Sequence, residues 1–111
     1  MAGLNTTWHM SDRIIHLQDV TAFLDEQSRE VVPMCALELK KSLVREITGI
    51  DPHRVQQSDL SVPIIVEVDR VTGRPVVILD GNHRLTKANI LNADVCMRIL
   101  YSDERDMIFG A

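Results

Sequence analysis

Apolar residues recur at helical spacing in two segments of the first half of the chain. Residues 17–24 show this spacing, after an Ile-Ile pair that favours a short strand over residues 13–17. A second apolar stripe runs over residues 36–47, where Pro33 suits the first turn of a helix and Gly49 suits its end. We therefore predict a short strand and two helices before the polar middle of the chain.

The middle of the chain is polar and then turns strongly apolar. Residues 50–61 contain Pro52 and few apolar positions, which predicts a connecting loop with one helical turn. Residues 63–68 and 75–79 are rich in Val and Ile, and each run begins with a proline, which is tolerated at the start of a strand. A short polar connection separates the two runs, so we predict a β-hairpin.

After Asp80 the spacing of the apolar residues changes from that of a strand to that of a helix. Asn82 is suited to cap a helix that ends near Asn92, and residues 95–100 are typical of a strand. A strand, a tight turn, a helix and a strand form a β-α-β unit, and the loop of such a unit is a common place for a ligand. The expected fold is α+β, a small mixed sheet with a β-hairpin, this β-α-β unit and helices packed around it.

Composition indicates a single domain. The chain has 111 residues, of which 45% are apolar and 25% charged, so residues 1–111 suffice for one modest core but not for two. Its formal net charge is −4, and neither half resembles a basic tail that would bind nucleic acid. The four histidines form no close ligand pair such as H-E-x-x-H, which argues against a zinc site.

Cysteine usage and the N-terminus bear on the compartment. Cys35 and Cys96 form no C-x-x-C pair, so we interpret them as small core residues in a reducing environment. The first ten residues lack the charged and apolar regions of a secretion signal, and no apolar segment is long enough to span a membrane. We therefore expect a cytoplasmic protein without a membrane partner.

Residues 80–88 concentrate groups that bind anions. An apolar strand leads through Gly81 directly into a helix, whose first turn presents unpaired N–H groups and a partial positive charge. Glycine lets the backbone approach a ligand closely. Arg84 offers a planar guanidinium that can grip two phosphate oxygens, and Lys87 adds a mobile positive charge one turn later.

Two side chains of the same segment are suited to proton handling. His83 can donate to a phosphate or shuttle a proton, because its unperturbed pKa is about 6.5. Asp80, at the end of the strand, can hold Mg²⁺ or accept a proton from a substrate hydroxyl. A structural interpretation stays open beside this one. In it, Asn82 only caps the helix, Asp80 only shapes the turn, and the basic side chains form a solvated helix face.

The run D-G-N-H-R-L-x-K-A at residues 80–88, together with the strand before it and D-L-S-V-P-I-I-V at residues 59–66, resembles the ParB/sulfiredoxin-like superfamily. In that superfamily a comparable D-G-x-H-R or G-x-x-R box opens a helix beside the phosphates of a nucleotide. The resemblance covers residues 50–100. It implies that phosphate is contacted by Gly81, Asn82, His83 and Arg84, with Asp80 at the edge of the site.

Departures from the superfamily narrow the expected function. Sulfiredoxins have a cysteine where this chain has Asn82, and an amide cannot act as that nucleophile, so reduction of sulfinic acids is disfavoured. Partition proteins add a helix-turn-helix segment and a dimerising tail, and their second phosphate box resembles E-N-x-Q-R. We find neither, so we do not expect centromere binding. A kinase branch that phosphorylates free serine with ADP has the similar box D-G-H-H-R.

The leading hypothesis is a domain that binds a nucleotide or another phosphorylated small molecule at this turn, with Mg²⁺ and ATP, ADP or CTP as the expected cofactors. Hydrolysis or phosphoryl transfer is compatible with it: backbone amides and Arg84 would position the phosphates, and Asp80 or His83 would handle protons. The alternative is a non-catalytic adaptor that binds protein or DNA. A nuclease is a third option, but it needs a carboxylate cluster. The apolar residues 107–109 are suited to pack on the core or on a second copy of the chain, so a homodimer is compatible with the sequence.

Overall fold

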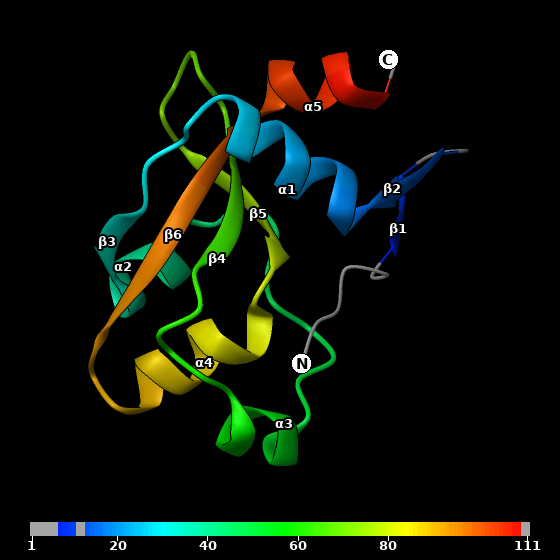
Figure 1. Cartoon of the computed structure of the whole chain (residues 1–111). Helices are drawn as coiled ribbons and strands as arrows, with labels where there is room; N and C mark the ends of the chain where they lie inside the picture. The colour runs from blue at the N-terminus through cyan, green and yellow to red at the C-terminus, as the bar shows by residue number, and fades with distance from the viewer. Residues whose placement is uncertain (1–6, 11–12, 110–111) are drawn as a thin grey trace.

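The computed structural model describes the backbone of residues 7–10 and 13–109 and the side chains of residues 17–108 (Figure 1). An antiparallel hairpin is formed by β1 (Thr7–Met10) and β2 (Arg13–His16). Helix α1 (Leu17–Glu26) follows directly. The strand and the first helix that the apolar pattern predicts are therefore confirmed.

Four strands form the main sheet. They lie in the order β3 (Val32–Cys35), β6 (Asp94–Tyr101), β4 (Ile64–Val68) and β5 (Pro75–Asp80). The pairing of β4 with β5 is antiparallel, which confirms the predicted hairpin, while β4 pairs with β6 in parallel. The helices are α2 (Ala36–Ser42), α3 (Pro52–Gln57), α4 (Asn82–Ile90) and α5 (Ser102–Phe109). The chain is thus an α+β domain with a small mixed sheet.

The helix expected between Pro33 and Gly49 is wrong at both ends. Pro33 lies in β3, an edge strand that pairs antiparallel with β6 and tolerates proline for that reason. Helix α2 ends at Ser42, after which the backbone N–H groups of Val44 and Arg45 donate to carbonyl oxygens at the start of β5. Pairing along the edges of the sheet therefore overrides the helical spacing of these apolar residues.

The predicted β-α-β unit also takes a different form. Strand, helix and strand follow one another as β5, α4 and β6, but β5 and β6 are not neighbours, since β4 lies between them. They also run in opposite directions, because β4 is antiparallel to β5 and parallel to β6. The parallel pair of this sheet is β4 and β6, whose connection includes both β5 and α4.

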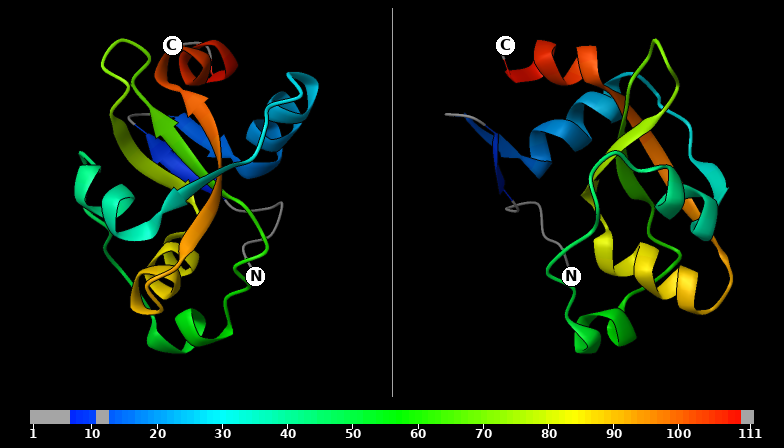
Figure 2. Two further views of the ribbon diagram at one scale, coloured as in Figure 1. Left: turned by 90° about the vertical axis from the view of Figure 1, so that its left-hand side faces the viewer. Right: turned by 180° about the vertical axis from the view of Figure 1, so that it is seen from behind.

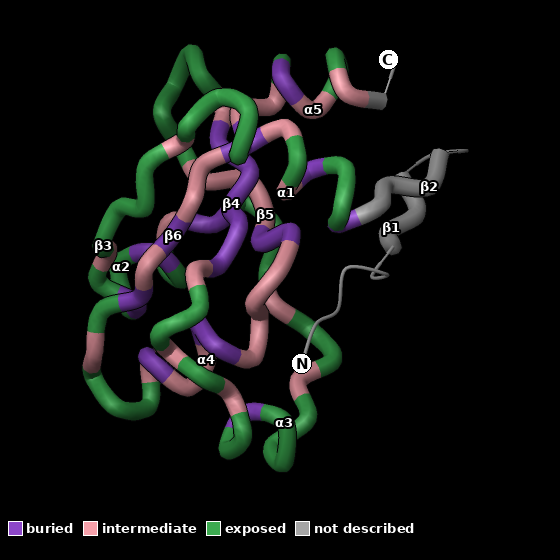
Figure 3. Tube along the Cα trace, in the orientation of Figure 1, coloured by how far each residue is buried: buried purple, intermediate pink, exposed green. Residues whose placement is uncertain are grey.

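Helices cover both faces of the sheet. In the left view of Figure 2, α1 and α2 lie on opposite sides of it. One face packs against α2 and α4 around a core that includes Leu39, Ile64, Val66 and Leu85. The other packs against α1 and α5 around Leu17, Val20, Leu24, Ile65, Leu79 and Leu100. Figure 3 shows that β4, in the middle of the sheet, is buried throughout.

Ion pairs attach α5 to the rest of the domain. Arg29, which follows α1, donates to Glu104 over 2.8 Å, and the fully buried Glu67 of β4 accepts from Arg105 over 2.9 Å and from Ser102 over 2.8 Å. The buried carboxylates thus have charged or hydrogen-bonding partners, as stability requires.

The two cysteines are not core residues. Cys35, at the end of the edge strand β3, is exposed, and Cys96 is partly exposed. The prediction that both are buried is therefore wrong. For Cys35 the reason is that the sequence pattern does not reveal that β3 lies at the edge of the sheet. Within residues 13–109, no helix combines the length and the apolar character that crossing a membrane requires.

Candidate functional site

The turn between β5 and α4 depends on Gly81. Its φ of +106° lies in a region that other residues rarely adopt, and a Cβ at this position would lie 2.8 Å from the Cβ of Ile64. Gly81 is also the N-cap of α4, so Asn82 is the first helical residue rather than the predicted cap. Among the described residues no side chain caps this helix, so the N–H groups of its first turn, which have no partner within the helix, also lack a side-chain partner.

Arg84 joins three parts of the chain. Its Nη1 donates to the carbonyl oxygens of Val62 and Pro63, over 3.2 Å and 2.8 Å, and its Nη2 donates to Oδ2 of Asp80 over 2.7 Å. The side chains of Arg84 and Asp80 are 11% and 12% exposed. Arg84 therefore holds the start of β4 against the end of β5, and a phosphate could use only its remaining donors.

His83 and Lys87 are engaged in a similar way with the segment around α3. The backbone N–H of Asp51 donates to Nε2 of His83 over 3.1 Å, so this imidazole accepts at Nε2 and is neutral. Lys87 donates from Nζ to the carbonyl oxygens of Gln56 and Ser58, over 3.0 Å and 2.7 Å, at the C-terminal end of α3. The basic side chains predicted to bind phosphate thus hold residues 51–63 in place.

Burial lowers the pKa of His83 below its ordinary value of 6.5. The positive charge of Arg54 lowers it further, and the carboxylate of Asp51 acts in the opposite direction. Since a protonated Nε2 could no longer accept from Asp51, the neutral imidazole is the form that the fold requires.

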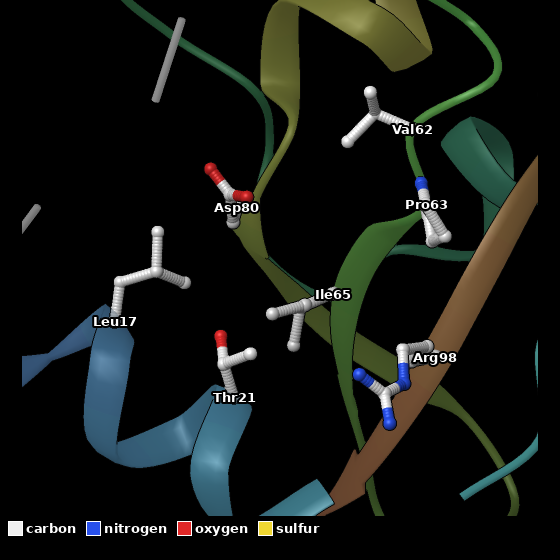
Figure 4. A pocket seen from close by; sticks show the side chains of 7 residues that line it. All are labelled: Leu17, Thr21, Val62, Pro63, Ile65, Asp80 and Arg98. Carbon is white, nitrogen blue, oxygen red and sulfur yellow. The ribbon is translucent and has the colours of Figure 1, made fainter. Parts of the chain in front are cut away.

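A cavity of about 210 Å³ lies beside this turn, between α1 and the sheet (Figure 4). Its lining includes residues at the start of β4 and at the end of β5. Asp80 lines it directly before the first turn of α4, and the other lining residues are Leu17, Thr21, Val62, Pro63, Ile65 and Arg98. Of the site residues predicted from the sequence, Asp80 therefore joins the turn to the cavity, and the others do not line it.

Arg98 and Thr21 are absent from the residues predicted from the sequence. Arg98 is paired with Ile65 of β4 across the sheet, and its Nε is buried without a hydrogen-bond partner in the described part of the chain. The sequence contains one indication that Arg98 is unusual, because it is a charged residue within an apolar strand. Nothing in the sequence places Thr21 opposite it, since that depends on how α1 packs on the sheet.

Among the predicted site residues, Asp80 is the one whose side chain could coordinate a divalent cation. Its Oδ2 is paired with Arg84, which leaves Oδ1 as the oxygen that could reach a cation. In residues 17–108, no three side chains of His, Cys, Asp or Glu form a group that could hold a metal ion. Mg²⁺ is commonly held by one or two carboxylates together with the phosphates of its ligand, so one carboxylate fits a Mg²⁺ that arrives bound to a nucleotide.

Comparisons of the chain with protein-family models, with curated proteins and with solved structures give no match. The site must therefore be interpreted from its own geometry.

Replacing Arg84 should destabilise the fold. Arg84→Met leaves Asp80 and two carbonyl oxygens without their partner, so the free energy of unfolding should fall by about 3 kcal/mol. The measurement is urea denaturation, with the exposed Arg45→Met as control, which should change stability by no more than about 0.5 kcal/mol. Equal stability of the two variants would contradict the clamping role of Arg84.

His83 should make stability depend on pH. Because its pKa is lower in the folded protein, the unfolded chain takes up the proton more readily. The contribution of the neutral imidazole is complete above pH 6.5 and is lost as the pH falls from there through the lowered pKa. In urea denaturation between about pH 5 and pH 7, His83→Gln should flatten this decline, whereas the exposed His53→Gln should retain it. An unchanged decline in His83→Gln would exclude His83 as its source.

Proposed function

We propose that the chain binds a phosphate-bearing small molecule, a nucleotide or another phosphorylated metabolite, at the first turn of α4. The observation that carries this proposal is the uncapped N-terminus of α4 beside an open cavity. An anion is the natural partner of such a helix end, because N–H groups and the helix dipole both favour negative charge.

The contrast with α3 supports this interpretation. The side chain of Asp51 caps α3 by accepting from the N–H of His53 over 3.0 Å. At α4, by comparison, Gly81 occupies the capping position and brings no side chain. A glycine has no side chain that could accept from the first-turn N–H groups, but it leaves room for a ligand oxygen to do so.

The charges around the turn do not oppose an anion. Asp80 would repel a phosphate, but its charge is balanced by Arg84. Arg98, which also lines the cavity, is paired with the exposed Asp25. These two pairs cancel in formal charge, so the net charge of −4 of the chain does not extend to the turn through them.

The volume of the cavity indicates which part of a ligand it would enclose. Pockets for drug-sized molecules commonly measure about 300–1,000 Å³, and this cavity measures about 210 Å³. It suits phosphoryl groups with part of a sugar, while a base would extend into solvent. The resemblance to the ParB/sulfiredoxin-like superfamily agrees with a nucleotide as the ligand.

The proposed function is the binding of a phosphorylated ligand. Bound Mg²⁺ would neutralise part of the phosphate charge, with Asp80 as its ligand from this chain. Both side chains expected to handle protons are engaged, Asp80 with Arg84 and His83 with Asp51. Neither is free to take a proton from a substrate without giving up a contact that holds the fold.

Calorimetry with AMP, ADP, ATP and CTP, each with and without Mg²⁺, tests the proposal. Asn82→Asp is the informative variant, because a carboxylate at the helix N-terminus stabilises the helix but repels an anionic ligand. We expect wild-type binding to weaken about tenfold in this variant, equivalent to about 1.4 kcal/mol.

Asn92→Asp serves as the matched control, since it makes the same change of charge beyond the other end of α4, where Asn92 is exposed. It should change affinity no more than about twofold, because exposed charges separated by a Debye length or more are largely screened. Equal losses in the two variants, or no binding of any nucleotide by the wild type, would contradict the proposal.

A further inference from the structure

We propose that Arg98 and Thr21 bind a second phosphoryl group inside the cavity, so that the ligand carries a diphosphate rather than a monophosphate. This inference rests on the proposed function, in which the first turn of α4 binds one phosphoryl group. It adds a subsite formed by residues outside the D-G-N-H-R box.

The guanidinium of Arg98 is incompletely paired. Its Nη1 forms an ion pair with Oδ1 of Asp25 at 2.8 Å, while its Nε is buried and has no hydrogen-bond partner among the described residues. Buried N–H groups nearly always have an acceptor, and an unpaired one on a charged group is especially unfavourable. Because Nε is closed to solvent, an oxygen atom inside the cavity would accept from the terminal Nη groups, one of which points toward Ile65 and Thr21 in Figure 4.

The ion pair with Asp25 does not satisfy Arg98 fully. The side chain of Arg98 is 17% exposed, whereas that of Asp25 is 64% exposed. A carboxylate so open to water contributes little to an ion pair and can leave without burying an unpaired charge. Arg98 can therefore exchange this partner for a ligand oxygen.

Thr21 provides a second donor. In Figure 4 its hydroxyl points into the space between Leu17 and Ile65, on the α1 side of the cavity, while Arg98 approaches from β6. A hydroxyl and a guanidinium that face one cavity from opposite sides are suited to the several oxygens of a phosphoryl group.

The surroundings strengthen this interaction. Leu17, Pro63 and Ile65 make much of the lining apolar, and charge-assisted hydrogen bonds are stronger where water is excluded. The cavity extends from Arg98 to Asp80, the residue directly before the first turn of α4. A diphosphate would place one phosphoryl group at each end, and a monophosphate would fill only one.

Comparison of AMP with ADP tests the inference by calorimetry without added metal. The wild type should bind ADP at least about tenfold more tightly than AMP, the gain expected from one charged hydrogen-bonding group. Arg98→Met keeps the length and apolar character of the side chain but removes its donors. In this variant the advantage of ADP should disappear, while AMP should bind as in the wild type.

Asp25→Asn provides a test in the opposite direction. It removes the carboxylate that competes for Arg98, so ADP should bind about threefold more tightly and AMP should be unaffected. A purely structural role of the Arg98–Asp25 pair would instead lower stability, as measured in urea, without changing the ratio of the two affinities. The exposed Arg45→Met serves as the control and should retain wild-type binding.

The outcomes separate the two proposals. If wild-type protein binds AMP and ADP equally, or if Arg98→Met keeps the preference for ADP, then the diphosphate inference is wrong. The proposed function survives that result. If neither nucleotide binds to the wild type, both proposals are wrong.

Discussion

The hydrogen bonds of Arg84 are the contact on which the site depends. One guanidinium reaches the carboxylate of Asp80 and two carbonyl oxygens just before β4, and it does so from a nearly buried position. It thereby fixes the turn after β5 against the residues that line the cavity. His83 precedes Arg84 in the same turn of α4, and it accepts a hydrogen bond from the backbone N–H of Asp51. The geometry of the turn and the position of residues 51–63 are set together.

This arrangement changes which groups are available to a ligand. From the sequence, the basic residues of the box are the expected phosphate contacts, yet Arg84, Lys87 and His83 all have partners within the chain. Within residues 17–108, the groups that stay available at this end of the sheet are the first-turn N–H groups of α4 and the guanidinium of Arg98, which is paired with the exposed Asp25. Anion recognition would therefore come from the backbone and from a strand residue, with the basic helix residues acting as supports.

The limits of sequence-based prediction follow from the same residues. The hairpin, the turn and the helix after it could be predicted, because Gly81 and the alternation of Val and Ile are local signals. The helix from Pro33 to Gly49 was mispredicted, since pairing of β3 and of residues 44–45 with distant strands decides that segment. Local sequence also cannot show that Lys87 reaches the carbonyl oxygen of Gln56, or that Thr21 faces Arg98. Both depend on tertiary packing.

The most direct test of this account is a titration of ¹⁵N-labelled protein with pyrophosphate, followed by NMR. The backbone N–H signals of Asn82 and His83 and the side-chain Nε–H signal of Arg98 should shift together and saturate at one concentration. The side-chain signals of Arg84 should stay in place, because its guanidinium remains bound to Asp80. Shifts of Arg84 without those of Arg98, or shifts confined to exposed lysines such as Lys40 and Lys41, would contradict the account.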